Sequence, residues 1–227
     1  MEDFVRHAVK FNRGLFLVFE GMDCSGKSTG VKWAVDKLNE LKIPVIQLRQ
    51  PGGTELGEKI RDIVLNGNNI NAVSELLLME ASRTEAYHTV INPALSQGTW
   101  VVCDRFNASS YAYQCAGKGL SRKTVYDVVE RNTPSRNIDC NVYIHRPFED
   151  ILAHLDTKDK DRMESLNKHV LEDIYTAYER LFNTGAYKNW YKISNDTDMD
   201  TYKEEVENLI TELAITYQSE ATRQLCL

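Results

Sequence analysis

The stretch FEGMDCSGKST, from Phe19 to Thr29, contains residue types that bind phosphate. Gly21, Gly26, Lys27 and Ser28 satisfy the spacing G-x-x-x-x-G-K-[ST]. In such a loop the glycines let backbone N–H groups wrap a phosphate, the lysine reaches the β- and γ-phosphates, and the hydroxyl faces Mg²⁺. The sequence therefore predicts a site for ATP or a related nucleoside triphosphate with Mg²⁺. Its residues are Gly21, Met22, Asp23, Cys24, Ser25, Gly26, Lys27, Ser28 and Thr29.

Charged residues also stand at the ends of two other apolar runs. Asp104 and Arg105 follow WVVC, and Arg49 follows PVIQL. Ligands bind at the carboxyl ends of strands in open α/β sheets, so Asp104 is a candidate Mg²⁺ ligand and Arg105 a candidate phosphate binder. Alone, each arginine is typical of a solvated surface or a strand-end salt bridge. Together with Arg61 and Arg83 on the following helices, they favour a second pocket for a phosphorylated substrate.

This second pocket narrows the class of protein. A phosphate loop by itself is shared by GTPases, motor-type ATPases and small-molecule kinases. A GTPase is expected to carry the guanine-reading sequence N-K-x-D, and this chain has none. A triphosphate site beside several arginines indicates a nucleotide kinase.

Short apolar runs alternate with longer segments of helical periodicity, and such alternation predicts an α/β fold with helices on both faces of a parallel sheet. Continuously apolar strands indicate burial on both faces. The expected class is the three-layer P-loop NTPase fold with a five-stranded parallel sheet. The expected strands are 15–19, 44–48, 100–103, 141–144 and 190–193.

Helical periodicity places the residues between these strands. A helix is expected over 54–65, with Thr54 as its N-cap and an apolar stripe formed by Leu56, Ile60, Ile63 and Val64. One long helix is expected over 73–91, ending near Pro93. Two more are expected over 166–182 and 201–217. Between them, residues 155–165 are highly charged and nearly free of apolar side chains.

Composition excludes several other classes. The chain has 227 residues and a formal net charge of −6, which does not resemble a duplex-DNA binder. Its five cysteines are widely spaced, as expected in a reducing compartment, and we expect a cytoplasmic protein. The first 14 residues lack the apolar core of a secretory signal, and no apolar run approaches the length of a membrane span.

Four ordered segments give the chain a resemblance to the thymidylate kinase family, running from about Leu15 to the C-terminal helix. They are FEGMDCSGKST, RQPGGTELGEKIRDIVL, CDRFNASSYAYQCAGKGL and DRMES. The resemblance implies one nucleoside monophosphate kinase domain over 1–227, with an N-terminal extension (1–13) and a lid at about 155–165. It also implies a homodimer. The chain is most similar to bacterial-type members of the family, which carry basic residues in the lid. A divergent or viral member is a further alternative.

The resemblance also implies roles for individual residues. Asp23 would lie near the sugar 3′-hydroxyl of a nucleoside monophosphate, and Tyr113 would lie beneath the sugar with Gln114 nearby. Arg83 would reach the O4 edge of the base and Ser110 its N3. The arginines expected to line the monophosphate side are Arg49, Arg61 and Arg105. Independently of the resemblance, Ser110, Tyr113 and Gln114 have i, i+3, i+4 spacing, so on a helix they point the same way.

Three positions depart from the family pattern. Met79 stands where a Phe commonly stacks on thymine, Gln50 replaces a Glu, and Cys24 stands where eukaryotic members have Arg. Met79 is interpreted as an equivalent hydrophobe, with altered base specificity as the sharper alternative. Without Arg at position 24, the catalytic cation is expected from the lid. The candidates there are Lys158, Lys160 and Arg162, of which Arg162 aligns with the family.

The expected reaction is transfer of the ATP γ-phosphoryl group to dTMP, giving dTDP and ADP. Lys27, Asp104, Arg105 and Arg162 are the expected catalytic residues, with Ser28 and Asp104 organising Mg²⁺. One alternative is a deoxynucleoside monophosphate kinase that accepts dUMP, a 5-substituted dUMP or several deoxynucleotides. Another is a nucleotide-binding regulatory module without turnover. No nucleic-acid or membrane partner is expected.

Overall fold

A five-stranded parallel sheet forms the centre of the computed structural model, which describes residues 2–10, 12–67, 70–155, 166–185 and 189–225. The strand order is β2-β3-β1-β4-β5, and every neighbouring pair is parallel. The strands are β1 (Phe16–Glu20), β2 (Val45–Arg49), β3 (Trp100–Asp104), β4 (Cys140–His145) and β5 (Trp190–Ser194). All five expected strands are confirmed within one or two residues, and so is the α/β fold class.

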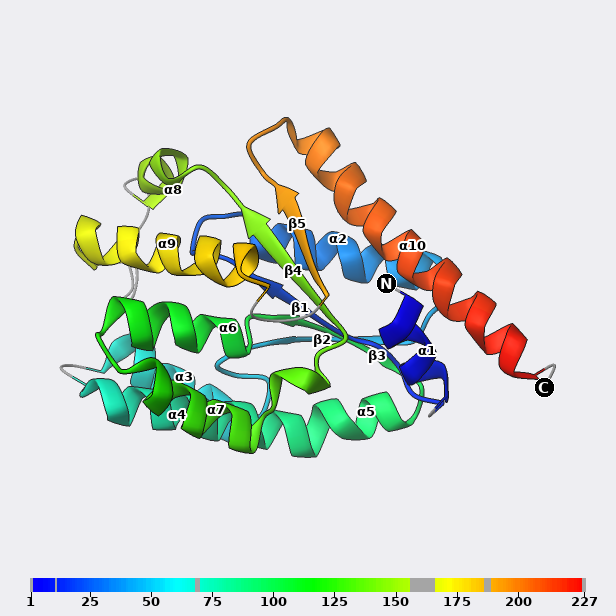
Figure 1. Ribbon diagram of the computed structural model, residues 1–227, viewed down its shortest axis with the longest axis horizontal. Helices are drawn as coiled ribbons and strands as arrows, with labels where there is room; N and C mark the ends of the chain where they lie inside the picture. The colour runs from blue at the N-terminus through cyan, green and yellow to red at the C-terminus, as the bar shows by residue number, and fades with distance from the viewer. Residues whose placement is uncertain (1, 11, 68–69, 156–165, 186–188, 226–227) are drawn as a thin grey trace.

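Helices cover both faces of this sheet (Figure 1). In chain order they are α1 (Glu2–Lys10), α2 (Lys27–Glu40), α3 (Glu55–Asn66), α4 (Ala72–Ala86), the π-helix η1 (Tyr87–Ile91), α5 (Asn92–Ser96), α6 (Asn107–Ser110), the π-helix η2 (Tyr111–Gly117), α7 (Arg122–Asn132), the 3-10 turn η3 (Ser135–Asn137), α8 (Phe148–Leu155), α9 (Lys168–Asn183) and α10 (Met199–Leu225).

The central strand β1 shows how the core is divided. Side chains alternate across a strand, so Leu17 and Phe19 face one side and Phe16 and Val18 the other. The first pair packs in the cluster formed with α1, α2 and α10, and the second pair packs with Phe106 and residues of α5. All five residues of β1 are buried, and each large apolar side chain contributes about 1.5–3 kcal/mol. The apolar run therefore anchors the phosphate loop that follows it.

The expected N-terminal extension forms part of this core. Val5, Ala8 and Val9 of α1 are buried, and α1 lies beside the C-terminal half of α10 (Figure 1). The Tyr217 hydroxyl on α10 donates to the Arg13 carbonyl at 2.9 Å. The segment before β1 is therefore tied to the last helix.

The predicted end of one helix needed correction. The helix expected to end near Pro93 continues through η1 and α5 to Ser96, with the proline in the first turn of α5. Asn92 N–H bonds to the Tyr87 carbonyl in a π-turn, so the hydrogen-bond register changes directly before the proline, which has no N–H to donate. On α3 the Thr54 cap is confirmed, since its hydroxyl accepts from Gly57 N at 2.9 Å.

The apolar stripe predicted on α3 is only half buried. Ile60 and Val64 lie in the interior, whereas Leu56 and Ile63 are 46% and 48% exposed. The next helix shows the same division, because Leu76 is buried and Leu77 is 53% exposed. Apolar side chains of α3 and α4 therefore remain at the surface.

Candidate active site

The phosphate loop connects β1 to α2, and its two glycines occupy positions where a side chain would be strained. Gly21 has φ 142° and Gly26 φ 94°, both in the region that favours glycine. A Cβ on Gly21 would lie 2.6 Å from the Ile144 carbonyl oxygen, and one on Gly26 would lie 2.3 Å from Asn195 Nδ2. The same Asn195 amide donates to the Ser25 carbonyl at 2.8 Å. The loop is thus held against the ends of β4 and β5.

Lys27 begins α2 and lies almost entirely inside the protein. Its side chain ammonium donates to the Met22 carbonyl at 2.6 Å, across the loop. Burial lowers the pKa of this ammonium to about 8, and the neighbouring Arg105 acts in the same direction. A ligand that brings negative charge would offset this burial, as a phosphate does.

Ser28 and Asp104 are brought together at the carboxyl ends of β1 and β3. The strand register pairs Asp104 with Phe19, and the Ser28 hydroxyl donates to Asp104 Oδ2 at 2.9 Å. The other carboxylate oxygen, Oδ1, is buried and has no hydrogen-bond partner among the residues that the structure describes. A hydroxyl beside a carboxylate with a spare oxygen fits Mg²⁺, which takes oxygen ligands and keeps several from water and substrate phosphates.

The guanidinium of Arg105 makes five hydrogen bonds at this site. Its Nη2 donates to Asp23 Oδ1 at 2.6 Å and to the Tyr113 hydroxyl at 3.1 Å. Its Nη1 donates to the Gly21 carbonyl at 2.9 Å and to the hydroxyls of Ser109 and Tyr178 at 3.2 and 3.0 Å. The backbone of Arg105 has φ 69°, an uncommon conformation for a residue other than glycine. These contacts fix the guanidinium between the phosphate loop and η2.

Asp23 shares this arrangement. The Tyr113 hydroxyl donates to Asp23 Oδ2 at 2.7 Å. Burial raises the pKa of the Asp23 carboxyl, but the charges of Arg105 and Lys27 and the hydrogen bond from Tyr113 outweigh burial and hold this pKa well below its ordinary value. Asp23 is therefore an anion at neutral pH and acts as a hydrogen-bond acceptor.

Two cavities meet at this point. The first, of about 910 Å³, is polar and is lined by Asp23, Cys24, Gly26, Lys27, Ser28, Thr29, Arg49, Gln50, Arg61, Asp104 and Arg105. The second, of about 590 Å³, is lined by Asp23, Gln50, Pro51, Arg61, Leu65, Met79, Arg83, Arg105, Phe106, Ser109, Ser110, Tyr113 and Gln114. Four residues belong to both: Asp23, Gln50, Arg61 and Arg105. A phosphate site and a more apolar site therefore share one wall.

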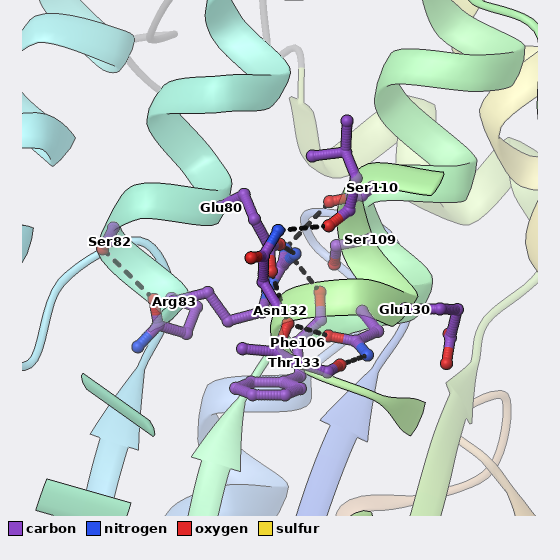
Figure 2. A network of polar contacts seen from close by, with 12 residues as sticks. Glu80, Ser82, Arg83, Phe106, Ser109, Ser110, Glu130, Asn132 and Thr133 are labelled. Carbon is purple, nitrogen blue, oxygen red and sulfur yellow. Dashed lines mark hydrogen bonds and ion pairs between the residues drawn. The ribbon is translucent and has the colours of Figure 1, made fainter. Parts of the chain in front are cut away.

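The second cavity contains the residues expected around a base and sugar. Ser110 ends α6, and Tyr113 and Gln114 lie in η2, so the segment is a π-helix rather than the regular helix on which the spacing argument rested. All three still line the same cavity. Arg83 donates through Nη2 to Ser110 Oγ at 2.8 Å and to the Phe106 carbonyl at 3.0 Å (Figure 2).

Arg49 and Arg61 also line the polar cavity, and the Arg49 side chain is much more exposed than that of Arg105. Arg49 pairs with Glu58 at 3.0 Å, and both side chains are about half exposed, at 56% and 46%. Arg61 donates to the Pro51 carbonyl at 3.1 Å and lines both cavities. The arginines predicted for a monophosphate thus surround one opening, with Arg105 fixed and Arg49 at the solvent side.

The hydrogen bonds of Gln50 explain why an amide, rather than a carboxylate, stands at this position. Its Nε2 donates to the Gly52 carbonyl at 3.2 Å, and its Oε1 accepts from the Ser82 hydroxyl at 3.2 Å. A carboxylate has no N–H for Gly52. The amide therefore fits a position that is 4% exposed and lies in the wall shared by the two cavities.

The remaining predicted site residues are three lid candidates and two residues of the phosphate loop. The lid candidates Lys158, Lys160 and Arg162 lie outside the described residues. Ser25 is buried, and its hydroxyl has no hydrogen-bond partner within the described ranges. Met22 contributes its carbonyl rather than its side chain, which is buried in the core with Tyr113.

Three residues of the site were missed by the sequence analysis. Glu20, the last residue of β1, is fully buried and accepts from Phe106 N, from the Ser109 hydroxyl and from the Tyr178 hydroxyl. A charged residue closing a buried strand was a signal for it. Tyr178 lies on α9 and had no local signal.

The third is Arg146, which follows β4 at the same sheet edge as Arg49 and Arg105. Its Nη1 donates to the Cys24 carbonyl at 3.4 Å, and in the described part of the chain its buried Nε has no hydrogen-bond partner. The strand-end argument used for Arg49 applied equally to Arg146 and was not extended to it.

No helix in the described ranges is long and apolar enough to cross a membrane.

Comparison with known proteins places these features in a family. The family model described as thymidylate kinase matches residues 19–210. Among curated proteins, the thymidylate kinase of Fervidobacterium nodosum is 41% identical over 167 residues, which are 74% of this chain and 84% of the relative. That of Thermosipho africanus is 36% identical over 197 residues, 86% of this chain and 97% of the relative.

A third relative and a solved structure agree with these matches. The thymidylate kinase of Methylobacillus flagellatus is 35% identical over 202 residues, 88% of this chain and 98% of the relative. The crystal structure of thymidylate kinase from Ehrlichia chaffeensis superimposes with a TM-score of 0.71 at 23% identity, covering 87% of this chain and 99% of that chain. At that identity the likeness concerns the fold.

Proposed function

The chain belongs to the thymidylate kinase family, and from this membership we propose that it transfers the γ-phosphoryl group of ATP to dTMP, giving dTDP and ADP. The observation that carries the proposal is the wall shared by the phosphate cavity and the second cavity. A donor in the first and an acceptor in the second would meet at Asp23 and Arg105. That is where in-line transfer requires them.

The acceptor phosphate is already an anion, so the reaction needs positioning and charge neutralisation more than a strong base. Lys27 would donate to the transferred phosphate, exchanging its bond to the Met22 carbonyl for a bond to ATP. Arg105 would hold the acceptor phosphate. Mg²⁺ would neutralise charge on the ATP phosphates, and Ser28 and Asp104 would hold it, as the spare buried Oδ1 supports.

The second cavity supports the roles assigned to the nucleoside. Asp23, an acceptor beside Tyr113, suits a sugar 3′-hydroxyl, and the Tyr113 ring suits a sugar without a 2′-hydroxyl. Arg83 and Ser110 would face O4 and N3 of the base. Met79 lines the same cavity and would pack on the base as a hydrophobe.

The cation missing at position 24 has two candidate sources. Arg162, on the segment expected to form the lid, remains a prediction. Arg146 is a second source, because its guanidinium lies 3.4 Å from the Cys24 carbonyl and has a buried N–H that no described residue accepts. We propose that Arg146 adds positive charge at the phosphate loop.

We also propose a homodimer. Its support is the exposure of apolar side chains on α3 and α4: Leu56, Ile63, Val73 and Leu77 are 43–53% exposed. Replacing Leu77 by Glu should shift the protein from dimer to monomer in sedimentation, because the charge would be buried without a partner. A wild-type protein that sediments as a monomer would contradict the proposal.

A reducing, cytoplasmic location is proposed from the thiols. The four cysteines in the described residues are all free: Cys24, Cys103, Cys115 and Cys140. Proteins of oxidising compartments use disulfides, and those of the cytosol rarely do.

An acceptor panel tests the proposed reaction. ATP is offered with dTMP, dUMP, dCMP or dGMP, and formation of each diphosphate is measured. We expect the highest kcat/KM with dTMP. If dTMP and dUMP were the poorest acceptors, a deoxynucleoside monophosphate kinase of other specificity would replace this proposal. If a single-turnover reaction with dTMP gave no dTDP, a regulatory module would replace it.

A further inference from the structure

A buried ion pair lies next to the second cavity, which is the one lined by Arg83. Glu80 and Arg83, one turn apart on α4, pair through Glu80 Oε2 and Arg83 Nη1, with side chains only 5% and 3% exposed (Figure 2). Arg83 lines the cavity, whereas Glu80 does not. The carboxylate therefore acts on that cavity through the guanidinium.

The second oxygen of Glu80 is also held. The Thr133 hydroxyl, just after α7, donates to Glu80 Oε1 at 2.7 Å, and Thr133 is fully buried. The Asn107 amide on α6 donates in turn to the Thr133 carbonyl. Arg83 and Thr133 thus hold the two oxygens of the Glu80 carboxylate, and Asn107 in turn holds Thr133.

The other contacts of Arg83 hold its guanidinium in one orientation. Nη2 donates to Ser110 and to the Phe106 carbonyl, and the guanidinium lies 5.4 Å from the centre of the Phe106 ring. Within the described residues, the buried Nε has no hydrogen-bond partner. Burial raises the pKa of the Glu80 carboxyl, so Arg83 and Thr133 must stabilise its ionised form. A buried pair of this kind is a poor source of stability, which points to a role in the site.

We propose that Glu80, held by Thr133, is a positioning residue for Arg83 and thereby sets which base the cavity accepts. This rests on the proposed function, in which Arg83 faces position 4 of a pyrimidine. A fixed guanidinium presents only donors, so it accepts a 4-keto group and rejects a 4-amino group, whose N–H would meet another donor. The carboxylate also cancels the charge of Arg83, so the cavity suits an uncharged base.

The discrimination depends on Arg83 being unable to turn away. Sites built to hydrogen-bond a substrate reject analogues that lack the matching group because buried polar atoms are left unpaired. Without the Glu80 carboxylate, Nη1 loses its partner and the guanidinium gains other orientations. A 4-amino base then meets a weaker penalty, and a 4-keto base a weaker attraction.

The test is Glu80→Gln, with Glu85→Gln as the matched control for the same change further along α4. We expect Glu80→Gln to lower kcat/KM for dTMP about 10-fold and to lower the ratio of dTMP to dCMP kcat/KM at least 10-fold. KM for ATP should stay unchanged, and Glu85→Gln should leave all three quantities unchanged. The ratio is the deciding quantity, because a merely structural role would lower both substrates equally.

Thr133→Val keeps the ion pair and removes only the hydroxyl, so it provides a milder second variant. It should move the same ratio in the same direction, by about 3-fold. Equal losses for dTMP and dCMP in both variants, or a rise in the ATP KM matching the loss, would overturn the inference. If Glu80→Gln did not fold, the ratio in Thr133→Val would decide alone. A wild-type enzyme that failed to prefer dTMP would instead contradict the proposed function.

Discussion

Replacing Arg105 by alanine removes one of the side chains that line both cavities. Five hydrogen bonds are lost, two through Nη2 to Asp23 and Tyr113 and three through Nη1 to Gly21, Ser109 and Tyr178. The carboxylate of Asp23 then keeps Tyr113 as a donor but loses its ion-pair partner at 2.6 Å. Both stability and turnover should fall.

The two losses have different magnitudes. Breaking a buried ion pair by removing one partner costs about 3–5 kcal/mol. Because the Asp23 side chain is 32% exposed, water replaces part of the lost contact, and we expect the lower end, about 3 kcal/mol. For a chain of this size that lowers Tm by about 6–12 °C. Removing one preorganised donor at the reacting phosphates should lower kcat about 100–1000-fold.

The assay measures kcat and KM for dTMP and for ATP at a temperature below the lowered Tm. Arg105→Lys is the informative companion, because it keeps the charge but not the planar five-donor fork, and it should recover stability more than turnover. Lys123→Ala, on the exposed face of α7, is the control and should change neither. A kcat in Arg105→Ala within 3-fold of wild type would refute the reasoning, since the shared wall would then not contain the acceptor phosphate.

Three further predictions concern the phosphate cavity. Asp104→Asn should raise the Mg²⁺ concentration for half-maximal activity about 10–100-fold, whereas Asp36→Asn, on the exposed face of α2, should not; equal Mg²⁺ requirements would contradict the assignment. Because burial lowers the pKa of Lys27 to about 8, the free enzyme loses this positive charge as pH rises through that value, and KM for ATP should rise above it, up to about tenfold per pH unit. Lys27→Arg should show no such rise, and a KM profile identical in both proteins would rule out Lys27 as its source. Arg146→Ala should raise KM for ATP about 10-fold with KM for dTMP unchanged, and Arg146→Lys should restore part of the loss; a change in the dTMP KM alone would place Arg146 at the wrong substrate.

Much of the secondary structure could be predicted from local sequence. The five strands and the Thr54 cap were identified because burial on both faces and helix capping leave marks on adjacent residues. The π-helical segments were not, since they depend on how a helix packs rather than on its own periodicity. The exposure of Leu56, Ile63 and Leu77 likewise could not be predicted from apolar periodicity, because periodicity does not show which neighbouring element covers a helix face.

By itself the sequence determined the phosphate loop, since Gly21, Gly26, Lys27 and Ser28 lie in one short continuous segment of the chain. Only the tertiary structure decided how the other groups are held. The hydroxyl of Thr133 reaches Glu80 across 53 residues, Arg146 reaches the Cys24 carbonyl across 122, and Tyr178 reaches Glu20 across 158. Hydrogen bonds need approach within about 3 Å, and sheet order with helix packing creates such approach between segments that no spacing rule connects.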